Sequence, residues 1–294
     1  MTSDLSSSSA ETSDDAEEQT PKKGPKQILR SEIREGLSAL ERSSASLFTS
    51  GLSAGLDVGF SGLLMAVMWT QTHDTLSPAV SAMLVGTMYS IGFIFVVIGR
   101  SELFTEQTTL AVLPVLSGQT SILSLLRLWV VVYVSNLIGA AVFAWLVAWI
   151  APALNAATPE SFGAIARKLT AHPSHVIFLS AILAGWLMGL LSWLVAAGRD
   201  TISQIVVVWL ITSCIGFVGL HHVVLGTVEV LAGVFSNQGI SYSEFFRVLL
   251  WATLGNIAGG SFFVALIKYG HAKPEHSQSH SNDQTASLGK GWPS

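Results

Sequence analysis

Long apolar runs separated by short polar connections dominate the chain after its first 46 residues. Six stretches reach about 20 residues, the length that a helix needs to cross a hydrocarbon core of about 30 Å. They lie near 50–70, 79–116, 122–150, 174–197, 203–235 and 244–269. The pattern predicts an all-α membrane protein, with six transmembrane helices in a channel domain over residues 47–270.

Two of these stretches, the second and the fifth, are too long for one straight crossing. Each has polar residues at its centre, namely Arg100, Ser101, Glu102, Thr105 and Glu106 in the second and His221 and His222 in the fifth. Free backbone groups are tolerated at membrane depth only where they line a cavity or are held by protein. We therefore predict that both helices are broken, with half-helix N-termini that favour an anion.

The first half of the chain resembles the second half at corresponding spans. Ala54, Gly55 and Gly59 correspond to Ala184, Gly185 and Gly189, and Asn136 and Gly139 correspond to Asn256 and Gly259. Three helices repeated after three helices must have opposite orientations in the membrane, so the repeat is inverted. The two breaks should then face each other at the midplane, with the glycines allowing close helix packing.

Charge is scarce and concentrated near the N-terminus. Only 12% of residues are charged, and mean hydropathy is +0.55. We predict disordered cytoplasmic tails over 1–27 and 271–294, and an amphipathic interfacial helix over 28–46. The Lys and Arg bias near the spans places both termini in the cytoplasm of a multi-pass inner (plasma) membrane protein. Arg167, Lys168 and Arg247 are exceptions to this bias.

Three segments, in order along the chain, carry a resemblance to a known family. The segment from Gly99 to Thr105 reads Gly-Arg-Ser-Glu-Leu-Phe-Thr, the next runs from Ser213 to His222, and the last is Asn256 with Gly259 and Gly260. Over residues 28–270 the chain resembles the formate/nitrite transporters. The resemblance implies an aquaporin-like inverted repeat and a homo-oligomer, expected to be a pentamer, with one pore per protomer.

The resemblance also implies roles for individual residues. Leu103 and Phe104 match the apolar constriction of the family, Thr105 its loop hydroxyl, His222 its central histidine and Lys168 a lysine of the external vestibule. The histidine would hydrogen-bond the anion or pass it a proton. Four positions depart from the pattern: His221 replaces an acid, Gly185 and Gly226 replace asparagines, and Glu106 replaces a small residue. The identity of the anion therefore stays open.

The remaining polar residues of the spans have structural interpretations. We expect Glu102 to cap the second half-helix through its free amides. Asp57 and Glu229 would pair with hydroxyls or amides, and Asn136 and Asn256 would support the breaks. His221 is left open between a pore role and a structural one.

Other classes of protein fit less well. A metalloenzyme using His221, His222 and Glu229 is disfavoured because adjacent helical histidines point in different directions, and a haem protein would need histidines on separate spans. The paired Asn-Pro-Ala loops of water facilitators are missing. We expect a lipid-embedded protein that is not an enzyme, with no cofactor, metal or nucleic-acid partner. It would move a small monovalent anion such as formate or nitrite, passively or with protons, and a scaffold that keeps the fold is the alternative.

Overall fold

The computed structural model describes residues 22–272, whose regular structure is entirely helical. Six of its helical segments are long and apolar enough to cross a membrane, which confirms the predicted number of spans. The elements are α2 (Pro25–Glu41), α3 (Ser44–Thr72), α4 (Pro78–Met88), α5 (Ser90–Gly99), α6 (Phe104–Leu110), α7 (Val112–Leu116), α8 (Ile122–Ala153), α9 (Pro159–Thr170), α10 (Ser174–Ala197), α11 (Thr201–Val218), α12 (Val223–Phe235), α13 (Tyr242–Ile257), the π-helix η1 (Ala258–Leu266) and α14 (Ile267–Ala272).

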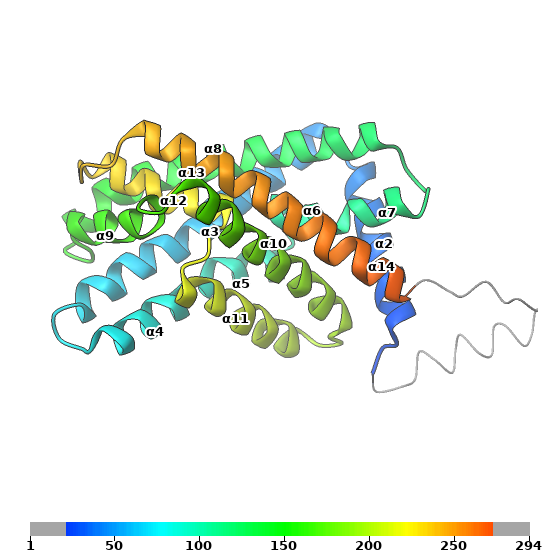
Figure 1. The fold of residues 1–294 in the computed structure, drawn as a ribbon, viewed down its shortest axis with the longest axis horizontal. Helices are drawn as coiled ribbons and strands as arrows, with labels where there is room; N and C mark the ends of the chain where they lie inside the picture. The colour runs from blue at the N-terminus through cyan, green and yellow to red at the C-terminus, as the bar shows by residue number, and fades with distance from the viewer. Residues whose placement is uncertain (1–21, 273–294) are drawn as a thin grey trace, which may run out of the picture.

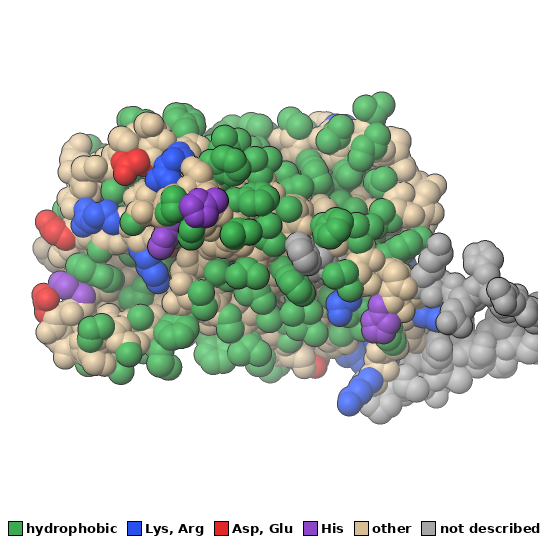
Figure 2. Space-filling view, in the orientation of Figure 1, with side chains coloured by type: hydrophobic (Ala, Val, Ile, Leu, Met, Phe, Trp, Pro, Cys, Tyr) green, Lys and Arg blue, Asp and Glu red, His purple; other side chains and the backbone are tan. Residues whose placement is uncertain are grey.

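The long helices run roughly along one axis of the molecule, with polar groups at its two ends. Figure 1 places α2, α7 and α14 at one end and α9 at the other. Charged and histidine side chains gather near these ends on the face shown in Figure 2, and the band between them is largely apolar. Exposed Val130, Leu146 and Trp149 of α8 belong to the apolar surface. Such a surface suits lipid or neighbouring subunits.

The second and fifth spans are broken, as predicted. The second span ends its first half with α5 and resumes with α6, and the fifth ends its first half with α11 and resumes with α12. Each first half is terminated by a residue with left-handed backbone, Arg100 at φ 56° and Gly219 at φ 78°. A left-handed residue at this position closes a helix and turns the chain out of it.

Glycines allow close helix packing within each repeat in the same way. A Cβ atom on Gly55 of α3 would lie 2.2 Å from the carbonyl oxygen of Asn136 on α8. The corresponding Gly185 of α10 would place a Cβ atom 2.4 Å from the carbonyl oxygen of Asn256 on α13. Neither backbone approach leaves room for a side chain, which confirms the close packing predicted for Gly55 and shows the same packing at Gly185.

The N-terminal helix differs from the prediction in both position and surroundings. It begins at Pro25 and ends at Glu41, and residues 44–46 already belong to α3 because Ser43 caps that helix by accepting from the Ser46 amide at 3.2 Å. Its apolar residues Ile28 and Leu29 are buried against the protein in a cluster with α7 and α14. The helix is therefore docked on the bundle by its apolar face.

The C-terminal end shows a smaller difference. Residues 271 and 272 continue α14, whereas the sequence placed them in a tail. The rest of the predicted tails, residues 1–21 and 273–294, lies outside the described residues. In the sixth span, the hydroxyl of Thr109 donates to the carbonyl of Gly260 at 3.1 Å, within the π-helical stretch η1. Such stretches interrupt the regular hydrogen-bond ladder of a helix and were not foreseen here.

Candidate functional site

Each break is held by one asparagine from the span that packs beside it. The Oδ1 atom of Asn136 accepts from the amide of Phe104 at 2.8 Å, and its Nδ2 donates to the carbonyls of Gly51 and Glu102. Asn256 repeats the arrangement, accepting from Val223 at 2.8 Å and donating to the carbonyls of Ala181 and His221. Backbone groups freed at both breaks are thus satisfied inside the bundle.

The two half-helices meet where Thr105 contacts His222. The Thr105 hydroxyl and the His222 Nε2 atom are 2.7 Å apart, which confirms that the breaks approach each other. The Nδ1 atom of the same ring accepts from the amide of Leu225 at 3.3 Å. A neutral imidazole has one donor and one acceptor nitrogen, so Nε2 carries the proton and donates to the Thr105 oxygen. The hydroxyl hydrogen of Thr105 stays free to donate.

The contact between Thr105 and His222 is buried, as are the nearby side chains of Phe93 and Leu103. Phe93 and Leu103 are 0% exposed, as is Thr105, and His222 is 1% exposed. The Phe93 ring stands edge-on to the His222 ring, with 5.0 Å between their centroids. We refer to Phe93, Leu103, Thr105 and His222 as the central barrier. Phe93 was not predicted from the sequence. Its position four residues after Tyr89 places the two rings on one helix face, where they stack, and this spacing could have indicated it.

Phe104 lies in a different environment from its neighbour Leu103. Its ring packs against Tyr133 and Trp129 of α8, with centroid separations of 4.8 and 6.1 Å. The side chain therefore anchors the start of α6 on α8, whereas the ring that contacts His222 within residues 22–272 is that of Phe93.

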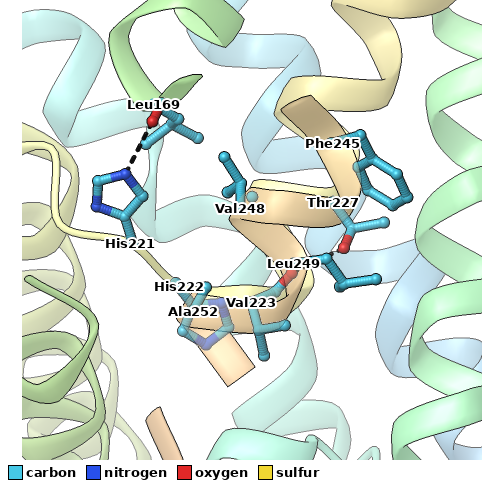
Figure 3. A pocket seen from close by; sticks show the side chains of 10 residues that line it. Leu169, His221, His222, Val223, Thr227, Phe245, Val248, Leu249 and Ala252 are labelled. Atoms are coloured by element: carbon cyan, nitrogen blue, oxygen red, sulfur yellow. Dashed lines mark hydrogen bonds between the residues drawn. The ribbon is translucent and has the colours of Figure 1, made fainter. Parts of the chain in front are cut away.

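His221 has both ring nitrogens occupied. Its Nε2 atom lies 3.0 Å from the carbonyl oxygen of Leu169, and its Nδ1 atom lies 2.9 Å from the hydroxyl of Ser180. Figure 3 shows its ring turned toward Leu169, while the His222 ring lies apart from it beside Ala252 and Val223. A cavity of about 10 Å³, room for roughly one water molecule, touches both histidines. Over residues 22–272, no cluster of three or more His, Cys, Asp or Glu side chains is arranged to hold a metal ion.

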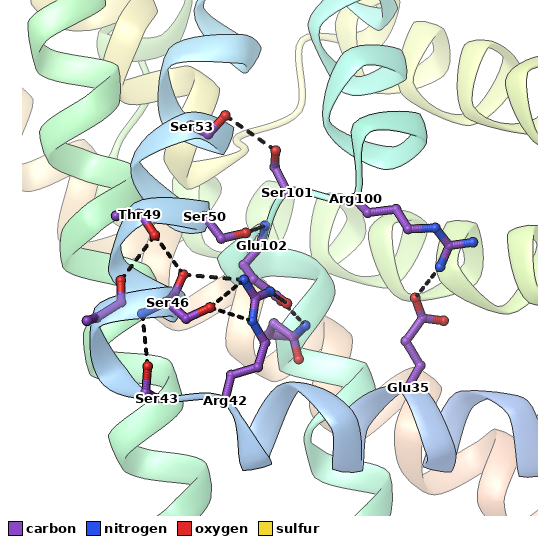
Figure 4. A network of polar contacts seen from close by, with 12 residues as sticks. Glu35, Arg42, Ser43, Ser46, Thr49, Ser50, Ser53, Arg100, Ser101 and Glu102 are labelled. Atoms are coloured by element: carbon purple, nitrogen blue, oxygen red, sulfur yellow. Dashed lines mark hydrogen bonds and ion pairs between the residues drawn. The ribbon is translucent and has the colours of Figure 1, made fainter.

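A polar cavity of about 550 Å³ opens at the end of the molecule where α2 lies. We call it the α2-side vestibule; its lining includes Glu32, Glu35, Arg42, Val96, Val97, Arg100, Glu102, Glu106 and Gln107. Figure 4 shows its polar network at the junction of α2 and α3. Arg42 donates to Glu102 at 2.6 Å, and the amide of Gln107 donates to the other oxygen of that carboxylate at 2.5 Å. Arg100 pairs more loosely with Glu35 at 3.7 Å.

This network corrects the role predicted for Glu102. Both of its carboxylate oxygens are bonded to side chains, and α6 has no side-chain cap from its own N-cap residue. The amide of Phe104 is bonded instead by Asn136 from α8. The sequence could not show this, because the cap comes from a residue 32 positions away.

Two carboxyls in the α2-side vestibule have no basic partner among residues 22–272. Glu106 follows the barrier residue Thr105 and forms no hydrogen bond or ion pair within the part of the chain that the structure describes. Glu32 on α2 is 1% exposed; its Oε1 atom is unbonded, and the hydroxyl of Ser192 donates weakly to Oε2 at 3.4 Å. Burial raises the pKa of Glu32 well above its usual range, and the carboxyls of Glu35 and Glu106 raise it further.

A second cavity, of about 340 Å³, lies on the opposite side of the central barrier. We call it the α9-side vestibule; its lining includes Trp69, His73, Val85, Tyr89, Lys168, Leu169, Gly219 and Glu229. Lys168 lines this vestibule, and its side chain covers Gly219. A Cβ atom added to Gly219 would lie 2.6 Å from the Cε atom of Lys168.

The two other acidic residues of the spans differ from each other. Glu229 is 7% exposed and makes no hydrogen bond or ion pair within residues 22–272, unlike the hydroxyl or amide pairing predicted for it. Asp57 does accept from hydroxyls, those of Ser53 at 3.1 Å and Ser101 at 3.4 Å. Of the two, only Glu229 is therefore available to a ligand in a vestibule.

Basic residues that run against the charge bias have local partners. Arg167 donates to the carbonyl of Gln238 at 3.1 Å, and Arg247 donates to the carbonyls of His172 and Thr170 at 2.6 Å each. Cationic side chains near the C-terminal ends of helices bond carbonyl oxygens that the helices leave free. These two arginines tie connections together at the α9 end.

Comparisons with known proteins agree with this architecture. The family model of the formate/nitrite transporters matches residues 26–270. The inner membrane protein YfdC of Escherichia coli K12 is 34% identical over 247 residues, covering 83% of this chain and 77% of that protein. A probable formate transporter of Methanothermobacter thermautotrophicus is 33% identical over 231 residues, covering 73% of this chain and 84% of the relative.

Solved structures show the same fold at lower identity. An ion channel of this family superposes with a TM-score of 0.74 at 23% identity, covering 84% of this chain and 99% of its own. A pentameric formate channel with formate bound gives a TM-score of 0.66 at 24% identity, and the match covers 78% of this chain and 97% of the channel's chain. Given the family match over most of its length, the broken spans and the paired asparagines, this chain belongs to the formate/nitrite transporter family.

Proposed function

We propose that each protomer carries a small monovalent anion, such as formate or nitrite, across the membrane between its two vestibules. The observation that carries this proposal is the 2.7 Å contact between Thr105 and His222, which joins the two breaks within the central barrier. Cavities of about 550 and 340 Å³ lie on either side of that barrier. A solute moving between them would pass this contact.

The chemistry of the barrier suits an anion that arrives partly dehydrated. Half-helices α6 and α12 begin there, and helix N-termini present the positive end of their dipole. The Nε2–H group of His222 and the hydroxyl of Thr105 supply donors among otherwise apolar side chains. Loss of hydration is costly for an anion, and a histidine that has taken up a proton can pass it to the anion of a weak acid and neutralise it during passage. We therefore favour proton-coupled or passive movement through the same pore.

The relatives support transport over a scaffold role. Their names include nitrite transporters of Escherichia coli and Salmonella typhimurium and a formate channel of Haemophilus influenzae. We propose that the chain is not an enzyme and that it works as a homo-oligomer, a pentamer like the solved formate channel. We also place the α2 end in the cytoplasm of the inner membrane, since α2 and α14 lie at one end and basic residues precede the first span.

Substitution of His222 tests the proposal. In proteoliposomes, we expect His222→Asn to keep part of the formate or nitrite flux and to lose its coupling to proton movement, because a donor is kept and a titratable group is lost. We expect His222→Phe to abolish flux. Radiolabelled uptake with an internal pH dye gives both quantities, protein-free vesicles correct for leakage of the neutral acid, and exposed His175→Asn is the matched control. Unchanged flux and pH dependence in both assembled variants would contradict the assignment.

A further inference from the structure

Basic side chains form a row along the outer side of the docked helix α2. Lys26, Arg30 and Arg34 recur at every fourth position, and all three are exposed. Residues four apart on a helix lie on the same side of it, so the three cations are neighbours along the helix axis. We call these three residues the basic row.

The acidic residues of α2 lie away from the basic row. Between Lys26 and Arg34 the one acid is Glu32, which is buried on the side that faces Ser192 of α10. Glu35 follows Arg34, but successive helix residues point about 100° apart, and its carboxylate pairs with Arg100 in the α2-side vestibule. The basic row therefore presents three like charges along one exposed side of the helix.

The surroundings of α2 place the basic row at the boundary between lipid tails and headgroups. Helix α2 packs against α14, at whose start the apolar side chain of Ile267 is 54% exposed. The next residue, Lys268, holds its ammonium group 5.2 Å from the centroid of the Trp193 ring. Trp193 belongs to the same buried cluster as Ile28 and Leu29 of α2. An exposed apolar turn followed by a Trp and Lys pair is typical of the membrane–water interface.

Cations at this level meet the phosphate groups of phospholipids. Guanidinium groups can donate two parallel hydrogen bonds to one phosphate, and an ammonium group binds it as a point charge. A phosphatidylcholine headgroup also carries its own cation, so its net charge is zero and a row of cations gains little from it. A phosphatidylglycerol headgroup keeps its negative charge, and each Lys or Arg near such a surface strengthens binding by roughly fivefold.

A bound anionic lipid would also stabilise the docked position of α2. Docking buries Ile28 and Leu29 against the bundle and brings the basic row to the side of α14, which carries Lys268. A headgroup layer that contacts both the row and Lys268 gains the combined contact only while α2 is docked. Any ligand that binds one conformation more tightly than the other shifts the equilibrium toward the first.

We propose that the basic row, with Lys268 beside it, is a binding surface for the headgroups of anionic phospholipids, and that the bound lipid holds α2 on the bundle. The inference goes beyond the proposed transport function, because it concerns the outer side of α2 and holds whichever solute crosses the pore. The lipid is recognised by its net negative charge, and its tails lie against exposed apolar residues such as Ile267.

Lipid binding to the full chain tests the recognition step. Native mass spectrometry with phosphatidylglycerol and phosphatidylcholine gives both lipid affinities and the state of assembly. We expect the wild type to prefer phosphatidylglycerol by at least about tenfold, and the triple variant Lys26→Gln, Arg30→Gln, Arg34→Gln to prefer it by less than about threefold. The matched control, Lys26→Arg, Arg30→Lys, Arg34→Lys, keeps the charge and should keep the preference. In wild-type protein, NaCl raised from about 0.05 to 0.5 M should remove most of the preference by screening.

Two of these results would overturn the proposal. One is an unchanged preference for phosphatidylglycerol in the assembled triple Gln variant. The other is a wild-type preference that persists at high salt, which needs no variant to fold. Either would show that the basic row does not recognise the charge of the lipid.

Hydrogen exchange of residues 25–41 tests the effect on docking. In wild-type protein, the amide hydrogens of α2 should exchange at least about threefold more slowly in phosphatidylglycerol nanodiscs than in phosphatidylcholine nanodiscs. The triple Gln variant should show no difference, and the charge-conserving variant should behave like the wild type. Equal or faster wild-type exchange in phosphatidylglycerol would refute the anchoring role. Equally slow exchange in phosphatidylcholine with soluble polyglutamate would assign the surface to an acidic protein instead of a lipid.

Discussion

At each of the two breaks, one asparagine side chain bonds several backbone groups that the interrupted helix leaves free. Asn136 bonds one amide and two carbonyls, and Asn256 does the same in the second repeat. Both residues are 0% exposed, so water has no access to replace those bonds. An uncompensated group in this environment costs about 1–3 kcal/mol. The breaks therefore depend on these residues for stability as much as on helix packing.

Replacing Asn136 by Ala should lower the free energy of unfolding by about 2–4 kcal/mol, because three backbone groups lose their partner together. The measurement is the thermal unfolding midpoint in detergent, where we expect a fall of roughly 5 °C or more. Exposed Gln119→Ala, which removes one hydrogen bond to a neighbouring serine side chain, is the control and should change the midpoint little. An Asn136→Ala midpoint equal to that of the control would contradict this account.

Residue types were easier to foresee from the sequence than residue partners. Polar residues at the centre of two long apolar runs indicated where the chemistry lies, and Thr105 and His222 do meet there. The resemblance favoured His222 for the pore role, but the linear pattern could not show that both ring nitrogens of its neighbour His221 are bonded elsewhere. Nor could it pair Arg42 with Glu102 across 60 positions. Such pairings depend on which helices become neighbours, and a linear pattern does not contain that information.

At the scale of elements, α2 connects a buried acid to the docking of a whole helix. Glu32 lies on the face of α2 that packs against α10 and has only Ser192 as a weak donor. Its pKa is raised by burial, above an ordinary value of about 4.3 for glutamate. As the pH rises from that value, the undocked helix loses its proton before the docked helix does. Docking is therefore strongest in acid and weakens until the pH passes the pKa of the docked form.

We expect the amide hydrogens of α2 to exchange more slowly at pH 5 than at pH 8, once intrinsic rates are corrected. Glu32→Gln should remove most of this difference and slow exchange at pH 8, because the buried group no longer ionises. Glu41→Gln, an exposed acid at the end of the same helix, should behave like the wild type. Hydrogen exchange of residues 25–41 measures the effect, and identical pH dependence in all three proteins would disprove the linkage.

Elements were predicted well where hydrophobic length alone decides them. Six spans and two breaks follow from runs of about 20 apolar residues and the polar centres of two longer runs. The position of α2 was less predictable, because the sequence pattern does not show whether its apolar face covers lipid or protein. The π-helical stretch η1 was missed for a related reason: its carbonyl at Gly260 is bonded by Thr109 of α6, a contact 151 positions away.

The whole molecule contains both vestibules and the barrier within one chain. Repeat one supplies Phe93, Leu103 and Thr105 to the barrier, and repeat two supplies His222. A single protomer thus has every group that the proposed pathway uses. Assembly into a ring would bury apolar surface such as that of α8, but it adds no residue to the pathway described here. Each protomer should then conduct independently of its neighbours.

Mixed assemblies test this independence. Wild-type chains and His222→Phe chains, carrying different affinity tags, are co-assembled at known ratios and reconstituted. If each protomer has its own pore, formate flux should fall in proportion to the wild-type fraction, to about half in an equal mixture. A pathway shared by all five subunits of a pentamer would need five wild-type chains, leaving about 3% of the flux in the same mixture. Native mass spectrometry confirms the composition of the assemblies, each near five times the 31.3 kDa chain. A steep, non-proportional fall would show that the solute crosses between subunits and would remove the Thr105 and His222 contact from the pathway.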